Sequence, residues 1–196
     1  KQVLTELPQH KTHDYIVADF SNPSDLKSKV SEFIFNNHGF HILVNNTGGP
    51  KGGPVFSAAV DEFDSAFTQH LKCNHILTQI VVPFMKEEGY GRIVNVISTS
   101  VKQPLDGLGV SNTIRGAVAN WSKTLANELG QFGVTVNNVL PGATGTERLS
   151  EIIKNKMKPL ILVILGFAAA YTPIYTANEC NTCLTNPNKW GSVCRS

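Results

Sequence analysis

Cysteine is scarce in most of this 196-residue chain and crowded at its end. Cys73 stands alone through the greater part of the sequence, whereas Cys180, Cys183 and Cys194 follow one another in the last stretch. The scarcity of cysteine before the last stretch excludes a disulfide framework for that larger part of the chain. The terminal cluster of cysteines is typical of proteins in an oxidising compartment. The two ends of the chain therefore suit different redox environments.

An excess of charge of one sign is absent as well. The chain has 17 Lys and Arg against 15 Asp and Glu, a formal charge of +2, so no electrostatic feature points to nucleic acid or an anionic surface. Internal repeats and low-complexity tracts are also lacking. With 41% hydrophobic residues, the chain can bury the core of one ordinary domain. Composition changes sharply near Met157, which predicts one domain over residues 1–150 and a separate segment over 151–196.

Short apolar runs alternate with longer amphipathic ones up to about Val139, a pattern typical of βαβ units with a mostly parallel sheet. Buried parallel strands read as continuous apolar runs. Four such runs are predicted as strands: Tyr15–Ala18, His41–Val44, Ile93–Ile97 and Val134–Leu140.

Three helices are predicted between these strands. The first begins at a cap on Ser21 or Asn22, has Pro23 at an early position and ends before Gly39. The second runs over 60–85, with Pro83 expected to kink or stop it. The third covers 111–129, where apolar residues at helical spacing form a core stripe.

Three polar or glycine-containing elements follow predicted strands. Asn45-Asn46-Thr47-Gly48 comes after the second strand, Ser98 ends the run Gly91-Arg-Ile-Val-Asn-Val-Ile-Ser98, and Asn137-Asn-Val-Leu-Pro-Gly142 ends the last strand. Glycine at the carboxyl end of a parallel strand lets the backbone approach a ligand in the crevice of an open α/β sheet. Each element taken alone is also compatible with an ordinary turn or strand end.

Together and in this order, the elements resemble the short-chain dehydrogenase/reductase family over residues 1–150. The resemblance implies a Rossmann-like, doubly wound α/β fold and NAD(P)-dependent hydride transfer to or from a small carbonyl or alcohol, in the cytoplasm. NAD and NADP are not distinguished. The positions that match the family's cofactor contacts are Asp19, Asn45, Asn46, Gly48, Pro141, Gly142 and Thr146. Asp19 is equally compatible with a helix cap or turn.

The catalytic positions depart from the family pattern. Ser98 matches the family's catalytic serine, but Ser111 and Arg115 occupy the places of its tyrosine and lysine, and His70 that of an asparagine. A serine hydroxyl is a poorer acid than a phenol of pKa about 10, and arginine does not titrate as lysine does. Two interpretations stay open: a variant site in which the imidazole of His70 relays the proton, and a scaffold that has lost the usual chemistry.

The resemblance also implies that this sequence starts before the family's third strand. The two preceding strands, with the glycine-rich turn that receives the cofactor pyrophosphate, are not in it, so we expect an incomplete sheet and impaired activity. The alternatives are a non-catalytic remnant or binding protein, and a secreted or membrane-tethered fusion. A homo-oligomer through the long helices is a further expectation.

The tail is predicted to be foreign to the dehydrogenase-like part. Basic residues precede an apolar run and then small residues over 157–177, which resembles a signal peptide, and 178–196 resembles the start of a secreted cysteine-rich module. The polar residues beyond Tyr171 argue against a membrane span. A zinc site at Cys180 and Cys183 lacks a second ligand pair, so no metal is expected. The internal signal-like run leaves the localisation of the whole chain open.

Overall fold

The computed structural model describes residues 13–37, 39–143, 145 and 150. By Cα proximity the chain divides into Lys1–Thr144 and Gly145–Ser196, and the fold below belongs to the first of these. The predicted tail, with its signal-like run 157–177 and its cysteines at 178–196, lies outside the described residues, as does Thr146. The helices and strands of the described part are α2 (Pro23–Asn37), β1 (Ile42–Asn45), α3 (Val60–Phe67), α4 (Cys73–Glu87), β2 (Gly91–Val96), α5 (Gly109–Leu129) and β3 (Val134–Val139).

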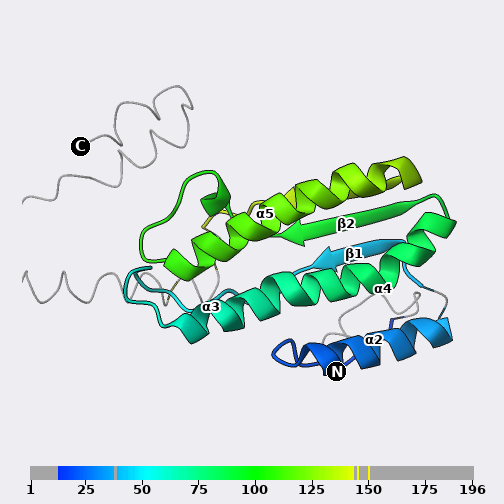
Figure 1. Ribbon diagram of the computed structural model, residues 1–196, viewed down its shortest axis with the longest axis horizontal. Coiled ribbons are helices and arrows are strands. Elements are labelled where there is room, and N and C mark those ends of the chain that lie inside the picture. Colours follow the sequence, from blue (N-terminus) through cyan, green and yellow to red (C-terminus); the bar gives the residue numbers. More distant parts are fainter. Residues whose placement is uncertain (1–12, 38, 144, 146–149, 151–196) are drawn as a thin grey trace, which may run out of the picture. The chain divides into compact units, whose positions relative to one another are not determined.

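The strands form a parallel sheet in the order β1-β2-β3, which confirms an α/β fold (Figure 1). Three of the four predicted strands are present within two residues of their expected bounds. Helix α4 packs on β1 and β2, α5 packs on β3, and α2 lies beside α4. Each crossover between parallel strands is made by a helix, as the alternating sequence pattern predicts.

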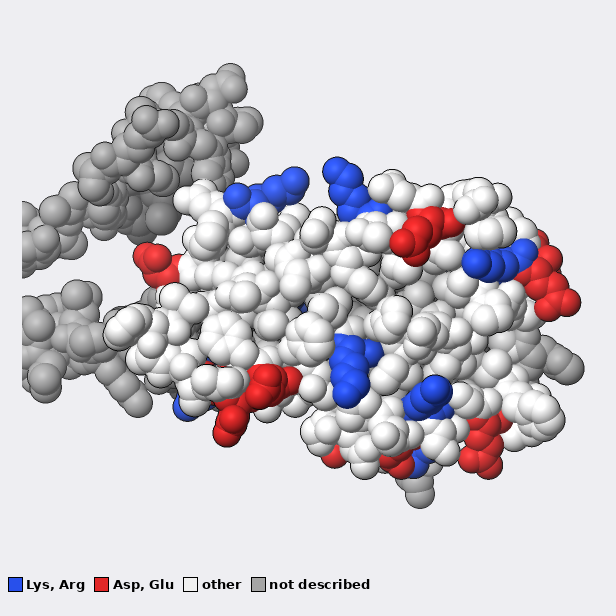
Figure 2. Space-filling model, viewed as in Figure 1, with Lys and Arg blue, Asp and Glu red and all other residues white. Residues whose placement is uncertain are grey.

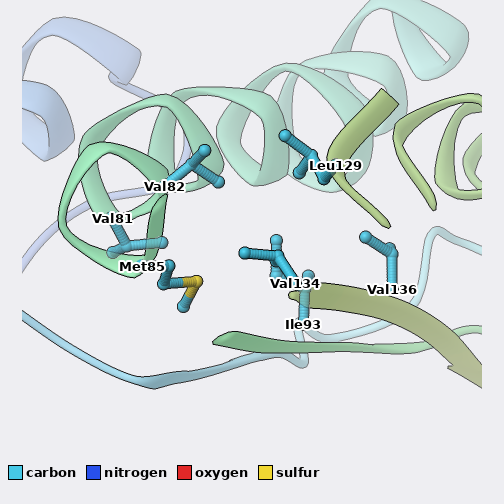
Figure 3. Close-up of a cluster of buried hydrophobic side chains, with 7 residues drawn as sticks. All are labelled: Val81, Val82, Met85, Ile93, Leu129, Val134 and Val136. Atoms are coloured by element: carbon cyan, nitrogen blue, oxygen red, sulfur yellow. The ribbon is translucent and has the colours of Figure 1, made fainter. Parts of the chain in front are cut away.

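One face of the sheet carries the core. Ile93, Val134 and Val136 point from the strands toward side chains of α4 and α5 (Figure 3). Met85 and Ile93 are fully buried in this cluster, at 0% exposure. Because strand residues alternate between faces, the intervening residues lie on the other side, where Ile42 and Val44 are more than half exposed. The described helices therefore cover a single face.

The prediction of a strand over 15–18 was wrong. These residues form no strand, and Val17 is 74% exposed. A strand needs a neighbour for its backbone N–H and C=O groups, and none of the described strands pairs with this segment. The apolar run alone does not supply that partner.

The helix at the start is as predicted, and the long second helix is not. The side-chain oxygen of Asn22 accepts a hydrogen bond from the backbone N–H of Asp25, so Asn22 caps α2 with Pro23 in the first turn. The stretch expected as one helix over 60–85 is divided by a π-helical turn, Thr68–Lys72. Pro83 does not stop α4, which runs on to Glu87.

Candidate functional site

The carboxyl end of β1 places one asparagine inside the fold and the next on its surface. Asn45 is 4% exposed, and its amide donates to Oδ1 of Asn95 on β2 at 2.8 Å. Asn46 and Gly48 are exposed just beyond the strand. A Cβ atom added to Gly48 would meet nothing within 4 Å, so the loop leaves open space beside its backbone. The loop is thus anchored by Asn45 and accessible to a ligand.

His70 lies on the π-helical turn and is 1% exposed. Its Nδ1 and the Thr47 hydroxyl oxygen are 2.5 Å apart, a hydrogen bond that joins the π-helical turn to the loop after β1. Turns of this kind are rare in proteins and concentrate at functional sites, because the extra residue turns one side chain away from the regular helical position. The buried imidazole is therefore held at the same edge of the sheet as Asn45.

Ser98 follows β2 and is half-buried. Its hydroxyl oxygen accepts a hydrogen bond from the backbone N–H of Ser100 at 3.0 Å, which orients the side chain and leaves its O–H proton available to a substrate oxygen. The loop after β3 lies against this turn, since the N–H of Thr99 donates to the carbonyl of Pro141 at 3.1 Å. Gly142, next in the chain, is exposed.

Ser111 and Arg115 lie one turn apart at the start of α5, at 7% and 8% exposure. The guanidinium Nη1 of Arg115 donates to the carbonyl of Val96 on β2 at 2.9 Å. Helix α5 also contacts the π-helical turn of His70 and the short 3-10 turn after Ser98. The structure thus brings all four predicted catalytic positions to one edge of the sheet.

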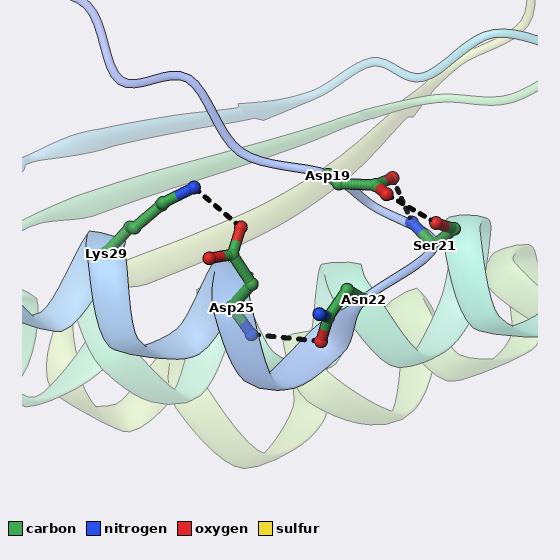
Figure 4. Close-up of polar contacts among 5 residues, drawn as sticks. All are labelled: Asp19, Ser21, Asn22, Asp25 and Lys29. Carbon is green, nitrogen blue, oxygen red and sulfur yellow. Dashed lines mark hydrogen bonds and ion pairs between the residues drawn. The ribbon is translucent and has the colours of Figure 1, made fainter.

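Asp19 occupies a turn before α2, away from these residues in the chain. Its carboxylate accepts hydrogen bonds from the Ser21 hydroxyl at 2.6 Å and the Ser21 backbone N–H at 2.8 Å (Figure 4). The two hydrogen bonds favour the charged form and lower the pKa of Asp19 below its usual value. Asp19 therefore has the geometry of a turn residue. The sequence is compatible both with this role and with a contact to the cofactor.

The surroundings of the site are mixed in charge. A pocket of about 340 Å³ opens beside His70, with Lys51, Asp61 and Glu62 at its wall, and Lys51 Nζ lies 3.7 Å from Glu62 Oε1. Lys and Arg are interspersed with Asp and Glu over the face shown in Figure 2.

Within the described residues, no three His, Cys, Asp or Glu side chains are grouped as a metal site. None of the helices in this part is long and apolar enough to cross a membrane.

The order of these elements matches a known sequence family. A family profile described as short chain dehydrogenase matches residues 1–157. The chain belongs to the short-chain dehydrogenase family. One relative is the 4-formylbenzenesulfonate dehydrogenase of Comamonas testosteroni, 31% identical over 139 residues, which are 70% of this chain and 55% of that protein. Another is the 7alpha-hydroxysteroid dehydrogenase of Bacteroides fragilis, 27% identical over 179 residues, 83% of this chain and 69% of that protein.

Solved structures of short-chain dehydrogenases agree with the fold. The 3-ketoacyl-(acyl-carrier-protein) reductase of Brucella melitensis, complexed with NADH, is 29% identical with a TM-score of 0.63, covering 69% of this chain and 58% of that one. The L-sorbose reductase of Gluconobacter frateurii, complexed with NADPH and L-sorbose, is 26% identical with a TM-score of 0.66, covering 73% and 54%. The chain spans about half the length of most of the relatives it matches.

Two parts of the site were not found from the sequence. The first is Thr47, whose place in the loop motif gives no indication that its hydroxyl pairs with His70. The second is Asn95, which is fully buried and hydrogen-bonded to both Asn45 and Ser122. A polar residue inside a buried parallel strand was the available signal, because such a side chain requires a hydrogen-bond partner.

Proposed function

We propose that this chain is part of an NAD(P)-dependent oxidoreductase acting on a small carbonyl or alcohol. The observation that supports it most is the convergence of Ser98, Ser111, Arg115 and His70 at the carboxyl edge of a parallel sheet in a member of this family. Ligands of open α/β sheets bind at that edge. Structural relatives complexed with NADH and with NADPH support both cofactors equally.

The residues present fit such a cofactor. The loop at Asn46 and Gly48 is exposed and has room beside its backbone, and Pro141 and Gly142 lie in the loop after β3, which contacts the turn after β2. When bound, the nicotinamide group supplies or accepts the hydride. The protein positions the substrate oxygen beside it.

In the variant site we propose, Ser98 donates a hydrogen bond to the substrate oxygen. Arg115 holds a fixed positive charge close to the end of β2, where its guanidinium is anchored on Val96. His70, which is hydrogen-bonded to Thr47, relays the proton, because an imidazole ring both donates and accepts hydrogen bonds, whereas a guanidinium does not give up its proton and a serine hydroxyl is a poor acid. Without a phenol at position 111, we expect carbonyl turnover to be slow.

A second candidate function is that of a non-catalytic binding protein. It is favoured by Arg115, whose guanidinium is committed to the backbone of β2 instead of standing open in the crevice. In either case we place the dehydrogenase-like part in the cytoplasm. A secreted or tethered fusion through the tail remains the third proposal.

We also propose that two copies associate through α4 and α5. These helices border a groove of about 490 Å³, where Pro83 is exposed and Leu125 is half-buried. Paired long helices bury such residues when they pack against a second pair. Sedimentation velocity of the full chain is expected to show a dimer, and a monomer at all concentrations would contradict it.

The enzymatic proposal is tested by ligand-observed NMR on the full chain with NADH and NADPH. Saturation transfer to the nicotinamide protons is expected, with a weaker signal after Arg115→Ala. No transfer to either cofactor at millimolar concentration would overturn the proposal.

Turnover with a panel of aldehydes and ketones separates the two functions. Slow activity that is abolished by His70→Ala supports the variant site. Activity only in the double variant Ser111→Tyr, Arg115→Lys supports the binding protein.

A further inference from the structure

The hydrogen bond between Thr47 and His70 links a buried side chain to an accessible loop. At 1% exposure, the imidazole of His70 has almost no contact with solvent. Thr47 is half-buried in the loop after β1, and its neighbours Asn46 and Gly48 are exposed. The pair therefore leads from the surface of this loop to the enclosed ring.

The π-helical turn that carries His70 is held in place by more than this one bond. Ala66, in α3 just before the turn, packs with Val110 and Ile114 of α5. The turn itself contacts α5 and continues directly into α4. Removing the Thr47 hydroxyl is therefore expected to leave the turn where it is, so that an effect on the ring can be separated from an effect on the fold.

The chemistry of the two partners indicates which of them donates. A neutral imidazole has one protonated and one bare nitrogen, and a hydroxyl can donate to a bare Nδ1 or accept from a protonated one. An imidazole nitrogen takes up a proton near neutral pH in water, whereas an alcohol oxygen does not, so the imidazole lone pair is much the stronger base. The stronger hydrogen bond is therefore the one in which the Thr47 hydroxyl donates to Nδ1.

We propose that Thr47 is a positioning residue that holds His70 as the tautomer with its proton on Nε2 and a bare Nδ1. The consequence for the relay rests on the proposed function. A proton released when an alcohol is oxidised, as the hydride passes to the nicotinamide cofactor, enters the ring through this bond. Thr47 Oγ1 takes up one proton and gives its own to Nδ1, so the threonine is unchanged and the ring becomes an imidazolium.

The tautomer is read directly from long-range proton–nitrogen correlation NMR of the full chain at alkaline pH, where imidazole rings are neutral. His70→Gln identifies the His70 signals by their loss. We expect a protonated Nε2 and a bare Nδ1 in the unaltered chain and in Thr47→Ser, which keeps the hydroxyl. In Thr47→Val the two tautomers are expected to mix. His75, exposed on α4 in an edge contact with Trp121, is the internal reference and should not change.

Two NMR outcomes overturn the proposal: a proton on Nδ1 of His70 in the unaltered chain, and the same single tautomer in Thr47→Val as in the unaltered chain. Turnover tests the consequence for the relay. Because general acid–base catalysis contributes about 10²–10⁴-fold, Thr47→Val is expected to lower kcat for alcohol oxidation at least about tenfold with little change in KM, and Thr47→Ser to keep most of it. An unchanged kcat in Thr47→Val overturns the relay role. If the unaltered chain oxidises no alcohol, the enzymatic proposal fails, while the NMR result still decides the tautomer.

Discussion

Gly133 joins α5 to β3, and replacing it with alanine is expected to destabilise the fold strongly. Its φ is +72°, and a Cβ atom there would lie 2.1 Å from the carbonyl oxygen of Gly89, where real Cβ contacts stay above 3.0 Å. The left-handed conformation costs alanine about 1–2 kcal/mol. Opening the contact by about 1 Å moves packed backbone, which adds about 1–3 kcal/mol. We expect Gly133→Ala to lose about 2–5 kcal/mol of unfolding free energy, measured by urea denaturation followed by circular dichroism.

Gly89 provides the matched control. It has a φ of +61°, yet a Cβ atom there would meet nothing within 4 Å. Gly89→Ala therefore pays only the conformational cost, about 1–2 kcal/mol. The difference between the two variants isolates the steric contact from the dihedral preference. Equal losses in the two variants would show that the turn relaxes without cost and would refute this reasoning.

Three further substitutions or treatments test the packing and the turn before α2. Met85→Ala empties a fully buried position of the core and should cost about 2–5 kcal/mol in urea unfolding, and a loss under about 1 kcal/mol would contradict the packing. Ser21→Ala should raise the pKa of Asp19 toward its ordinary value, read by NMR titration of the carboxyl carbon. Because the folded pKa is lowered, these hydrogen bonds stabilise the fold above the unfolded pKa, and their contribution is lost as pH falls through the folded pKa. An unchanged titration in Ser21→Ala would exclude the contribution of the hydroxyl bond. Burial raises the pKa of Cys73, so iodoacetamide at neutral pH should label it at least about tenfold more slowly than in the urea-unfolded chain, and equal rates would show an exposed thiol.

The apolar runs of the sequence were sufficient to locate the strands that have neighbours. Ile93, Val134 and Val136 belong to runs typical of buried parallel strands, and all three contribute to the core. The run at 15–18 is of the same kind and forms no strand. Strand formation depends on a hydrogen-bonded partner, and the pattern within one segment carries no information about its neighbours.

The sequence named candidate residues for the site, but it did not show how they are connected. Motif order brought out Ser98, Ser111, Arg115 and His70, and family membership is now shown by the match over residues 1–157. The hydrogen bond between His70 and Thr47 joins residues 23 apart, and that between Asn45 and Asn95 joins residues 50 apart. Contacts at such separations arise only when strands pair in the sheet and helices pack on it.

The sequence by itself determined the α/β class, the family, most strands and the cap of α2, because these depend on local patterns of polarity and on side chains adjacent in the chain. Only the tertiary structure decided that the long helix is interrupted by a π-helical turn at His70, and that the buried Asn95 side chain joins Asn45 of β1 to Ser122 of α5. Each of these depends on which backbone and side-chain groups are enclosed together and must find hydrogen-bond partners away from water. That requirement is set by packing between distant segments, which no local pattern encodes.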